Sequence, residues 1–495
     1  MEVKNTKHPS GLYTLFATEF WERFSYYGMR ALLVLYLTAS FTNGGFGMER
    51  SAALEIYAIF TGLVYLTPII GGLLADKYLG QRKAIFIGGV VMAAGQFTLA
   101  ASVSFDIGGN MEMREFLLYC GLGLLILGNG FFKPNISTMV GGLYDTNDPR
   151  KDSAFTIFYM GINLGAFLSP FVAGGLGEKV GWHWGYISAG AGMLIGLIWF
   201  YARKVSLKQV GLPPNGDESK ISLIFKDWLD ILYYSIGNIL LVVGFVKLIN
   251  IVNESTLDIV IWTTAAVGGL YLMWEIFKGT TGKTQWSRVS VILVLAVFHV
   301  IFWSGFEQAG GTFNLFAQEN TNRIVFGWDV PASWFQALNP VFIVILAPLF
   351  SMLWIKLSEI GNNPRTPYKF SYGLLLVGIG FIVMTGAQNK ADAGLMVSPL
   401  WLIGVYFLHT AGELCISPVG LSLITKLAPP KIVSVMMGLW MGSIALGNYL
   451  AGIMEKLLEK LDFELYPFIA AETIGASIVL LILAPFLSKM MKGIH

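Results

Sequence analysis

Charged residues are scarce in this chain. Lysine, arginine, aspartate and glutamate make up only 13% of its 495 residues, whereas soluble domains carry about a quarter of their residues as charges. Apolar runs of about 20 residues, each long enough to cross a bilayer, recur from one end to the other, and the mean hydropathy is +0.63. The composition therefore excludes an ordinary soluble domain and predicts an integral membrane protein.

Cysteine and metal-binding clusters are also nearly absent. The two cysteines, Cys120 and Cys415, both lie inside apolar runs, so we expect them to be reduced, buried and structural. His299 and His409 have no second ligand beside them, and we expect neither a metal nor a cofactor. No basic cluster predicts a nucleic-acid partner. Without an HExxH motif, paired intramembrane aspartates or a serine elbow, a membrane-embedded hydrolase is disfavoured.

Hydropathy and helix breakers predict an all-α membrane protein with fourteen spans. The spans are expected near residues 12–40, 53–77, 83–104, 114–140, 153–177, 183–202, 229–250, 257–277, 288–317, 332–356, 370–388, 399–425, 432–457 and 466–488. An even number of spans puts both termini on one side. If that side is the cytoplasm, the inner loops and tails hold 22 lysines and arginines and the outer loops hold 7. This asymmetry predicts that both termini are cytoplasmic.

A polar stretch divides the chain into parts. Residues 203–228 contain GLPPNGDESK, which is typical of a flexible linker. The two spans that follow carry almost no intramembrane charge, and without them six spans precede and six follow. Two bundles with charges facing a central gap are typical of a rocking transporter. We therefore expect an N-terminal six-helix bundle over 1–202, a linker with an inserted helix pair over 203–287, and a C-terminal six-helix bundle over 288–495.

The first span is unusually polar. Each charge inside a membrane helix costs roughly 2.5–3.5 kcal/mol on insertion scales, yet this span contains two acids and two arginines within EFWERFSYYGMRALLVLYL. The charged residues and two tyrosines fall on one helical stripe, at Glu19, Glu22, Arg23, Tyr26, Tyr27 and Arg30. The pattern predicts a polar seam along an interior path, with acids that can titrate.

Three more ionisable residues lie inside predicted spans. Lys133 is too central for its ammonium to reach an interface, so it needs a carboxylate partner. Glu307 sits in a glycine-rich span that can bend, where a buried acid could couple protonation to gating. Glu413 stands five residues before Pro418, which frees a backbone carbonyl at a place where a ligand could meet the helix.

Other side chains admit two interpretations or act at the surface. Aromatic residues in the spans fit either a pocket or the core, and the residues alone leave this open for Tyr26, Tyr27, Tyr65, Trp303 and Trp440. Arg50 and Glu319 lie just past the outer ends of their helices, one in each half. We hypothesise that this arginine and this glutamate form an outer gate pair.

Four motifs resemble signatures of the proton-coupled oligopeptide transporters, a branch of the major facilitator superfamily. They are EFWERFSYYG in the first span, FYMGINLGAF in the fifth, WFQALNPVF in the eighth helix of the core twelve and GELCISPVGLSLITKLAP in the tenth. The resemblance covers essentially the whole chain, and the two extra spans are similar to the helix pair that bacterial members insert between their halves. One departure stands out, because animal members carry a histidine at the position of Ala58.

The resemblance implies specific roles. The proton-handling group would be Glu19, Glu22 and Arg23, and Lys133 would respond to its protonation. Glu307 would be a second proton site, able to pair with Arg30 when substrate is absent. Arg30 and Lys133 would hold the carboxylate of a peptide and Glu413 its amino terminus. The remaining substrate contacts would be Asn163, Asn339, Tyr26, Tyr27, Tyr65, Trp303, Trp440 and Ser417.

The function that this resemblance implies is import of di- and tripeptides with protons by alternating access, driven by the proton gradient. A same-fold transporter of nitrate or another small solute is the alternative, although an anion site gains nothing from Glu307 and Glu413. The expected partners are the peptide, protons and membrane lipid. We expect a functional monomer in a bacterial plasma (inner) membrane.

Overall fold

The computed structural model describes residues 7–104, 111–145, 148, 150–213, 269–270 and 272–493. Within these residues the regular secondary structure is helical apart from one hairpin, β1 (Ile324–Val325) and β2 (Trp328–Asp329), and an isolated bridge between Thr321 and Val397. Ten helical stretches there are long and apolar enough to cross a membrane. The chain is therefore an all-α membrane protein. The total of fourteen spans stays a prediction, because the expected inserted pair at 229–250 and 257–277 lies largely outside the described residues.

The chain divides into two compact units, of which the first comprises Met1–Met48 and Leu63–Ile251. Its helices are α1 (Ser10–Thr38), α3 (Pro68–Leu74), α4 (Gln81–Ser104), α5 (Met111–Gly142), α6 (Lys151–Ser169), α7 (Gly175–Lys179) and α8 (Trp182–Arg203). Helix α1 packs against α6 and α8, and α4 packs against α5 and α8. Gly88 and Gly128 make the α4–α5 approach close, since a Cβ on either would lie 2.5–2.6 Å from the other's carbonyl oxygen.

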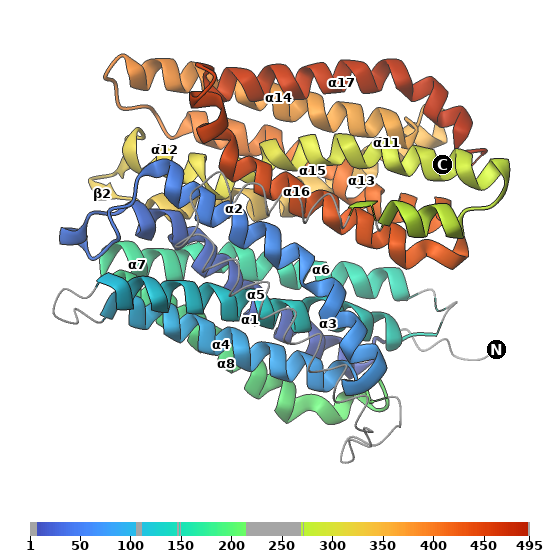
Figure 1. Ribbon diagram of the computed structural model, residues 1–495, viewed down its shortest axis with the longest axis horizontal. Helices are drawn as coiled ribbons and strands as arrows, with labels where there is room; N and C mark the ends of the chain where they lie inside the picture. Colours follow the sequence, from blue (N-terminus) through green and yellow to red (C-terminus); the bar gives the residue numbers. More distant parts are fainter. Residues whose placement is uncertain are drawn as a thin grey trace. The chain divides into compact units, whose positions relative to one another are not determined.

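The second unit comprises Glu49–Gly62 and Val252–His495, so α2 (Arg50–Leu66) contributes to both units. Its other helices are α11 (Gly282–Phe306), α12 (Thr312–Glu319), α13 (Leu338–Glu359), α14 (Thr366–Asp392), α15 (Leu400–Leu427), α16 (Val433–Glu459) and α17 (Leu465–Met490). Within each unit the long helices run side by side (Figure 1). Ser371 of α14 and Ser477 of α17 link their helices by reciprocal bonds of 2.9 and 2.8 Å to each other's carbonyl oxygen.

Short helical turns connect or extend these helices, and several spans that were expected to be continuous are interrupted. The turns are η1 (Phe41–Asn43), η2 (Ala75–Leu79), η3 (Pro170–Gly174), η4 (Lys204–Leu207), η5 (Glu307–Gly310), η6 (Ala332–Ala337) and η7 (Pro430–Ile432). The span expected at 153–177 is interrupted at Pro170–Gly174. The expected span at 53–77 is split, because α2 ends at Leu66 and α3 starts at Pro68, whose ring removes a backbone donor. The expected span at 288–317 is split at Glu307–Gly311.

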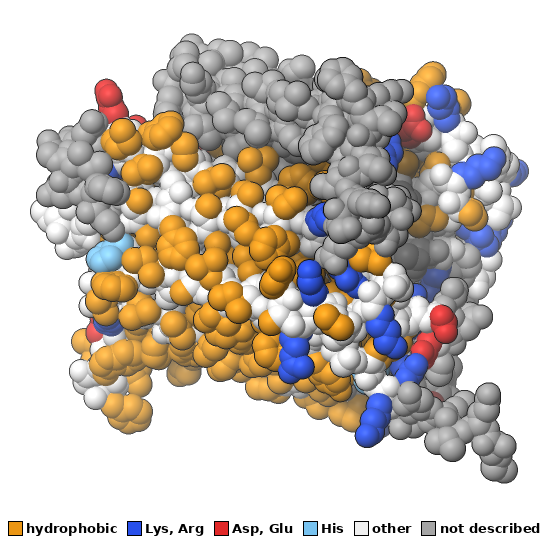
Figure 2. Space-filling view, turned by 90° about the horizontal axis from the view of Figure 1, so that it is seen from below, with side chains coloured by type: hydrophobic (Ala, Val, Ile, Leu, Met, Phe, Trp, Pro, Cys, Tyr) orange, Lys and Arg blue, Asp and Glu red, His pale blue; other side chains and the backbone are white. Residues whose placement is uncertain are grey.

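Apolar side chains cover the surface where lipid is expected. The face in Figure 2 is apolar over most of its length, and lysines and arginines gather toward one end. On α4 and α8, exposed apolar residues include Val90, Ile195 and Ile198. The two cysteines are free, as expected, but only Cys415 is fully buried and Cys120 is partly exposed.

Candidate functional site

The polar stripe of α1 is buried and paired within itself. Glu19, Glu22 and Arg23 are almost completely inaccessible to solvent. The Arg23 guanidinium donates to Glu22 through both Nε and Nη2, the latter at 2.6 Å, and its Nε lies 3.2 Å from Glu19 Oε1. Asn129 of α5 donates to Glu22 Oε1 at 3.3 Å. Glu19 Oε2 has no hydrogen-bond partner among the described residues, so two carboxylates share one guanidinium and one oxygen can take a proton.

The glycines of the FYMGINLGAF motif explain how α1 is held. Gly161 and Gly165 of α6 face α1, and a Cβ on Gly165 would lie 2.4 Å from the carbonyl oxygen of Phe20 and 3.0 Å from Arg23 Cβ. Only glycine allows the two backbones to come this close. Asn163, between them, donates to the carbonyl oxygen of Tyr159 in its own helix at 2.9 Å. The motif therefore positions the acidic stripe.

The two other cations expected in the site lie over tyrosine rings. The Lys133 ammonium is 3.8 Å from the ring centroid of Tyr65. The Arg30 guanidinium lies 5.6 Å from the ring centroid of Tyr27. Such cation–π contacts hold a cation over the face of an aromatic ring. Four residues expected in the site are thus brought together in two pairs within this unit.

In the second unit, two residues expected to contact substrate meet directly. Asn339 Nδ2 of α13 donates to Glu413 Oε2 of α15 at 2.9 Å and to Thr410 Oγ1 at 3.1 Å. Ser417 follows Glu413 by one turn on the same face of α15, and its hydroxyl is buried with no hydrogen-bond partner in the described part of the chain. These polar groups form one stripe on α15 that can donate to and accept from a ligand.

Glu307 sits at the break between α11 and α12. It is 4% exposed and accepts a hydrogen bond of 3.0 Å from the Tyr57 hydroxyl of α2. The next residue, Gln308, anchors the turn by donating to the carbonyl oxygen of Ala451 at 2.8 Å. A buried acid is therefore placed at the one interruption of its span, where a change of charge can act on the backbone.

The two tryptophans expected in the site are tied together by His299. The imidazole stacks on Trp440 with ring centroids 3.9 Å apart, and its Nε2 accepts from Trp303 Nε1 at 2.7 Å. Its Nδ1 lies 2.8 Å from the Ser443 hydroxyl, which itself donates to the carbonyl oxygen of Trp440. With Nε2 accepting, the ring must be neutral and carry its proton on Nδ1. His299 therefore packs within the second unit and orients both indoles.

An ion network surrounds Arg50 and Glu319. Arg50 Nη1 is 2.9 Å from Glu319 Oε2, the pairing that the sequence analysis hypothesised. Arg50 Nε is also 2.6 Å from Glu455 Oε1 of α16, and the neighbouring Lys456 Nζ is 2.8 Å from Glu55 Oε2 of α2. The side chains are partly exposed, so each ion pair alone contributes little stability. The residues of these pairs lie on neighbouring turns of their helices, so the pairs can break together.

Comparison with known proteins settles the family. The sequence profile of the POT family matches residues 82–474. The chain belongs to the POT family. It is similar to the peptide transporter YePEPT of Yersinia enterocolitica, with 37% identity over 497 residues that cover 97% of this chain and 94% of the relative. It is 35% identical to the di-/tripeptide transporter of Lactococcus lactis over 503 residues, covering 98% and 97% of the two chains.

A solved structure of the POT family has the same fold over nearly the whole chain. The peptide transporter POT in complex with sulfate aligns with a TM-score of 0.87 at 36% identity, covering 99% of this chain and 97% of that one. The resemblance noted in the sequence is therefore confirmed, and the protein is a membrane transporter of the major facilitator superfamily, not an enzyme.

Several site partners were missed by sequence reasoning. Three of them, Tyr57, Asn129 and Ser443, are polar residues within apolar spans. Polar residues are rare in such spans, and this rarity could have identified the three as candidates. Glu455 and Lys456 lie at the end of α16 and looked like ordinary interfacial charges. Which of these side chains contact one another depends on how the helices pack, and no single residue in the sequence indicates that packing.

The structure explains the alanine where animal members carry histidine. Ala58 is fully buried, and a Cβ on Gly452 of α16 would lie 2.4 Å from Ala58 Cβ. We expect Ala58→His to destabilise the protein by about 1–3 kcal/mol or more through overpacking. Thermal unfolding in detergent should show a lower midpoint than wild type, with Ala58→Ser as the small control. An unchanged midpoint for Ala58→His would show that the site has room for an imidazole.

Proposed function

We propose that the protein is a proton-coupled symporter that imports di- and tripeptides by alternating access. The observation that carries this proposal is the buried cluster of α1, where Glu19 and Glu22 share Arg23 and one oxygen of Glu19 has no donor among the residues that the structure describes. A purely structural ion pair does not need a second acid. The names of two relatives, a peptide transporter and a di-/tripeptide transporter, support the substrate class.

The proposed substrate site uses the charges at both ends of a short peptide. Arg30 and Lys133 bind the carboxylate, and Glu413 binds the amino group. In an extended di- or tripeptide these groups are roughly 5–10 Å apart. Free amino acids are too short to engage both, and long peptides cannot be enclosed. The hydrogen bond from Asn339 to Glu413 supports this role, because it fixes the carboxylate without neutralising it.

Side-chain recognition and peptide backbone contacts complete the proposed site. We assign the peptide backbone to Asn163 and Asn339 and the side-chain pockets to the aromatic residues Tyr26, Tyr27, Tyr65, Trp303 and Trp440. Tyr26 and Trp440 are almost fully buried in this structure, whereas Trp303 is partly exposed. Ser417 contributes its hydroxyl, which has no hydrogen-bond partner among the described residues.

Proton coupling follows from competition for the same cation. A charged Glu307 holds Arg30, and protonation of Glu307 releases Arg30 to the peptide carboxylate. Peptide and proton then enter together. Tyr57, which donates to Glu307, can do so to the charged acid and to the carbonyl oxygen of the protonated acid alike. The proposal places both termini in the cytoplasm of a bacterium, with six-helix bundles over 1–202 and 288–495 and a monomer as the working unit.

Uptake into proteoliposomes tests this function. Labelled dialanine should accumulate above its external concentration when the outside is acidic and the membrane potential is inside-negative, and a protonophore should abolish the accumulation. Unlabelled tripeptides should compete, and free alanine should not. Failure of every small peptide to accumulate would contradict the proposal, and accumulation of nitrate in its place would favour the alternative cargo.

The gate hypothesis makes a separate prediction for Arg50→Gln. Each partly exposed ion pair contributes about 0.2–1 kcal/mol, and Arg50 makes two. Their loss should shift the balance toward outward-open molecules about 2- to 30-fold. Distances between spin labels on the outer ends of the bundles would measure this balance. Arg323→Gln is the control, because Arg323 pairs with Asp329 in the hairpin. An unchanged balance in Arg50→Gln would refute the gate.

A further inference from the structure

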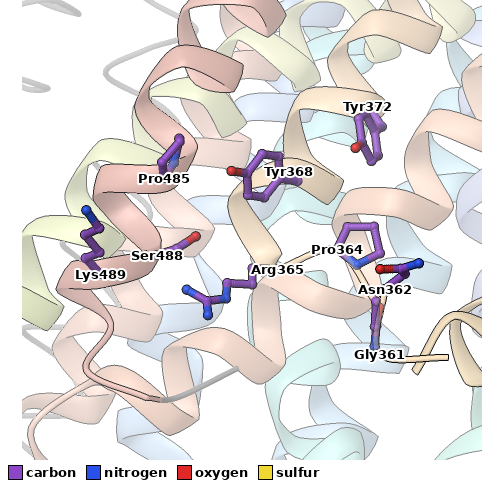
Figure 3. Close-up of a pocket in the computed structure, with 10 residues that line it drawn as sticks. Gly361, Asn362, Pro364, Arg365, Tyr368, Tyr372, Pro485, Ser488 and Lys489 are labelled. Atoms are coloured by element: carbon purple, nitrogen blue, oxygen red, sulfur yellow. The ribbon is translucent and has the colours of Figure 1, made fainter. Parts of the chain in front are cut away.

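A cavity of about 450 Å³ lies within the second unit, and none of its lining residues belongs to the proposed peptide site. It is formed by the loop after α13, the start of α14 and the end of α17, with Asn362, Arg365, Tyr368, Ser488 and Lys489 in its lining. Figure 3 shows the Arg365 guanidinium and the Tyr368 and Ser488 hydroxyls turned toward the space between α14 and α17. The cavity thus gathers one cation and two hydroxyls around a common space.

The electrostatics of this cavity favour an anion. Arg365 and Lys489 line it, and neither makes an ion pair with any residue in the described part of the chain. The described lining also includes no acidic residue. Helix α14 begins at Thr366 and runs for 27 residues, so the positive end of its dipole lies beside the same cavity.

Ser488 gives an independent sign of a missing ligand. The residue is 3% exposed, and its hydroxyl has no hydrogen-bond partner in the described structure although it lines the cavity. Buried hydroxyls are almost always hydrogen-bonded. Because Figure 3 shows this hydroxyl directed into the cavity, a ligand bearing acceptor oxygens would complete it.

Exposed apolar side chains form stripes along the two helices that adjoin the cavity. On α14, exposed residues follow Tyr368 and Tyr372 at helical spacing, at Leu375, Ile379 and Ile382. On α17 the exposed apolar residues Ile478, Ile482 and Phe486 form a similar stripe that ends near Lys489. Helices α14 and α17 pack against each other, so two apolar stripes end at one basic cavity. Basic pockets between membrane helices at the cytoplasmic surface are suited to lipid headgroups.

We propose that this cavity binds the headgroup of an anionic phospholipid. The phosphate lies against Arg365 and the Ser488 hydroxyl, Lys489 adds a second positive charge, and the acyl chains follow the exposed stripes of α14 and α17. Arginine suits this task because its planar guanidinium can bind two phosphate oxygens at once. A soluble phosphate could bind the polar groups of the cavity but would make no contact with the apolar stripes, so we assign the site to a membrane lipid.

Native mass spectrometry of the detergent-purified protein tests this assignment. Phosphatidylglycerol and phosphatidylcholine are titrated separately onto wild type, Arg365→Gln, Ser488→Ala and the control Lys431→Gln. We expect the tightest phosphatidylglycerol site to weaken about 10-fold in Arg365→Gln and measurably in Ser488→Ala, with no change in the control. Ser488→Ala leaves the net charge unaltered, so its effect separates a headgroup inside the cavity from general attraction to a basic surface.

Two outcomes would overturn the proposal. One is equal phosphatidylglycerol affinity in wild type and in both cavity variants, which would place the lipid elsewhere. The other is displacement of phosphatidylglycerol by millimolar inorganic phosphate, added as a competitor, which would identify the cavity as a site for a soluble anion. Arg365 is exposed, so its substitution should leave folding intact, and matching unfolding midpoints would establish this.

Discussion

Replacing Glu22 by glutamine is expected to abolish gradient-driven accumulation of peptide while leaving exchange of peptide across equal gradients partly intact. Glutamine keeps an oxygen at the Oε1 position for the Asn129 amide and Arg23 Nη2. It loses the charge and the acceptor for Arg23 Nε, but Glu19 still lies beside the guanidinium, so we expect the helix packing to survive the loss of the titratable group. A potential of about 100 mV and a difference of about one pH unit supply about 3.7 kcal/mol per proton, enough for roughly 500-fold accumulation. In Glu22→Gln this ratio should fall to about one.

The matched control for that experiment is Glu472→Gln. Glu472 also lies in a spanning helix, α17, and one of its carboxylate oxygens is buried without a hydrogen-bond partner in the described structure. It belongs to no proposed proton or peptide site, so accumulation should persist. Equal loss of accumulation and of exchange in Glu22→Gln would remove the proton role of Glu22 and leave it a structural residue.

Replacing Glu413 by glutamine is expected to weaken binding of peptides with a free amino terminus. The substitution removes a charge-assisted hydrogen bond to the peptide ammonium, worth about 2 kcal/mol, which corresponds to about a 30-fold weaker affinity. The side chain keeps its shape, and an oxygen remains for the Asn339 amide. Competition by unlabelled dialanine against a labelled dipeptide would measure the change.

N-acetylated dialanine distinguishes the proposed role from general damage. It lacks the ammonium, so it should bind weakly to wild type and equally weakly to Glu413→Gln. Glu472→Gln again serves as the control acid. If Glu413→Gln weakened the acetylated peptide as much as the free one, Glu413 would support the site without touching the amino group.

The stripe on α1 could be predicted because charges are expensive in a membrane and the helical period is regular. Those two facts select Glu19, Glu22 and Arg23 without any structure, and the structure places the three side chains in one buried cluster. The same reasoning put Lys133 and Glu413 inside spans. Their neighbours Tyr65 and Asn339 were known as candidates from the family resemblance, and the contacts between them come only from the folded chain.

Interruptions of the helices could not be located from hydropathy. A sliding window averages over a turn, so the breaks at Thr67 and at Glu307–Gly311 disappear into long apolar segments. Pro68 and the glycine pair after Ala309 were the local signals. The break at Glu307 matters for the mechanism, because it places a buried acid where the span can change direction.

Contacts between side chains on different helices could not be predicted from the sequence either. His299 lies on α11 and Ser443 on α16, 144 residues later in the sequence, and nothing in the spacing of either residue indicates their 2.8 Å contact. The glycines of α6 are a partial exception, since small residues at intervals of four predict a close helix approach. Their partner, α1, could not be named without the fold.

The central claim is that buried ionisable side chains exchange partners as peptide and proton bind, and the most direct measurement is proton entry driven by peptide alone. Proteoliposomes loaded with a pH-sensitive dye would receive external dialanine with no imposed proton gradient. The account predicts acidification of the lumen that depends on dialanine in wild type and is absent in Glu22→Gln. Uptake of labelled dialanine by wild type without any change of internal pH would contradict it.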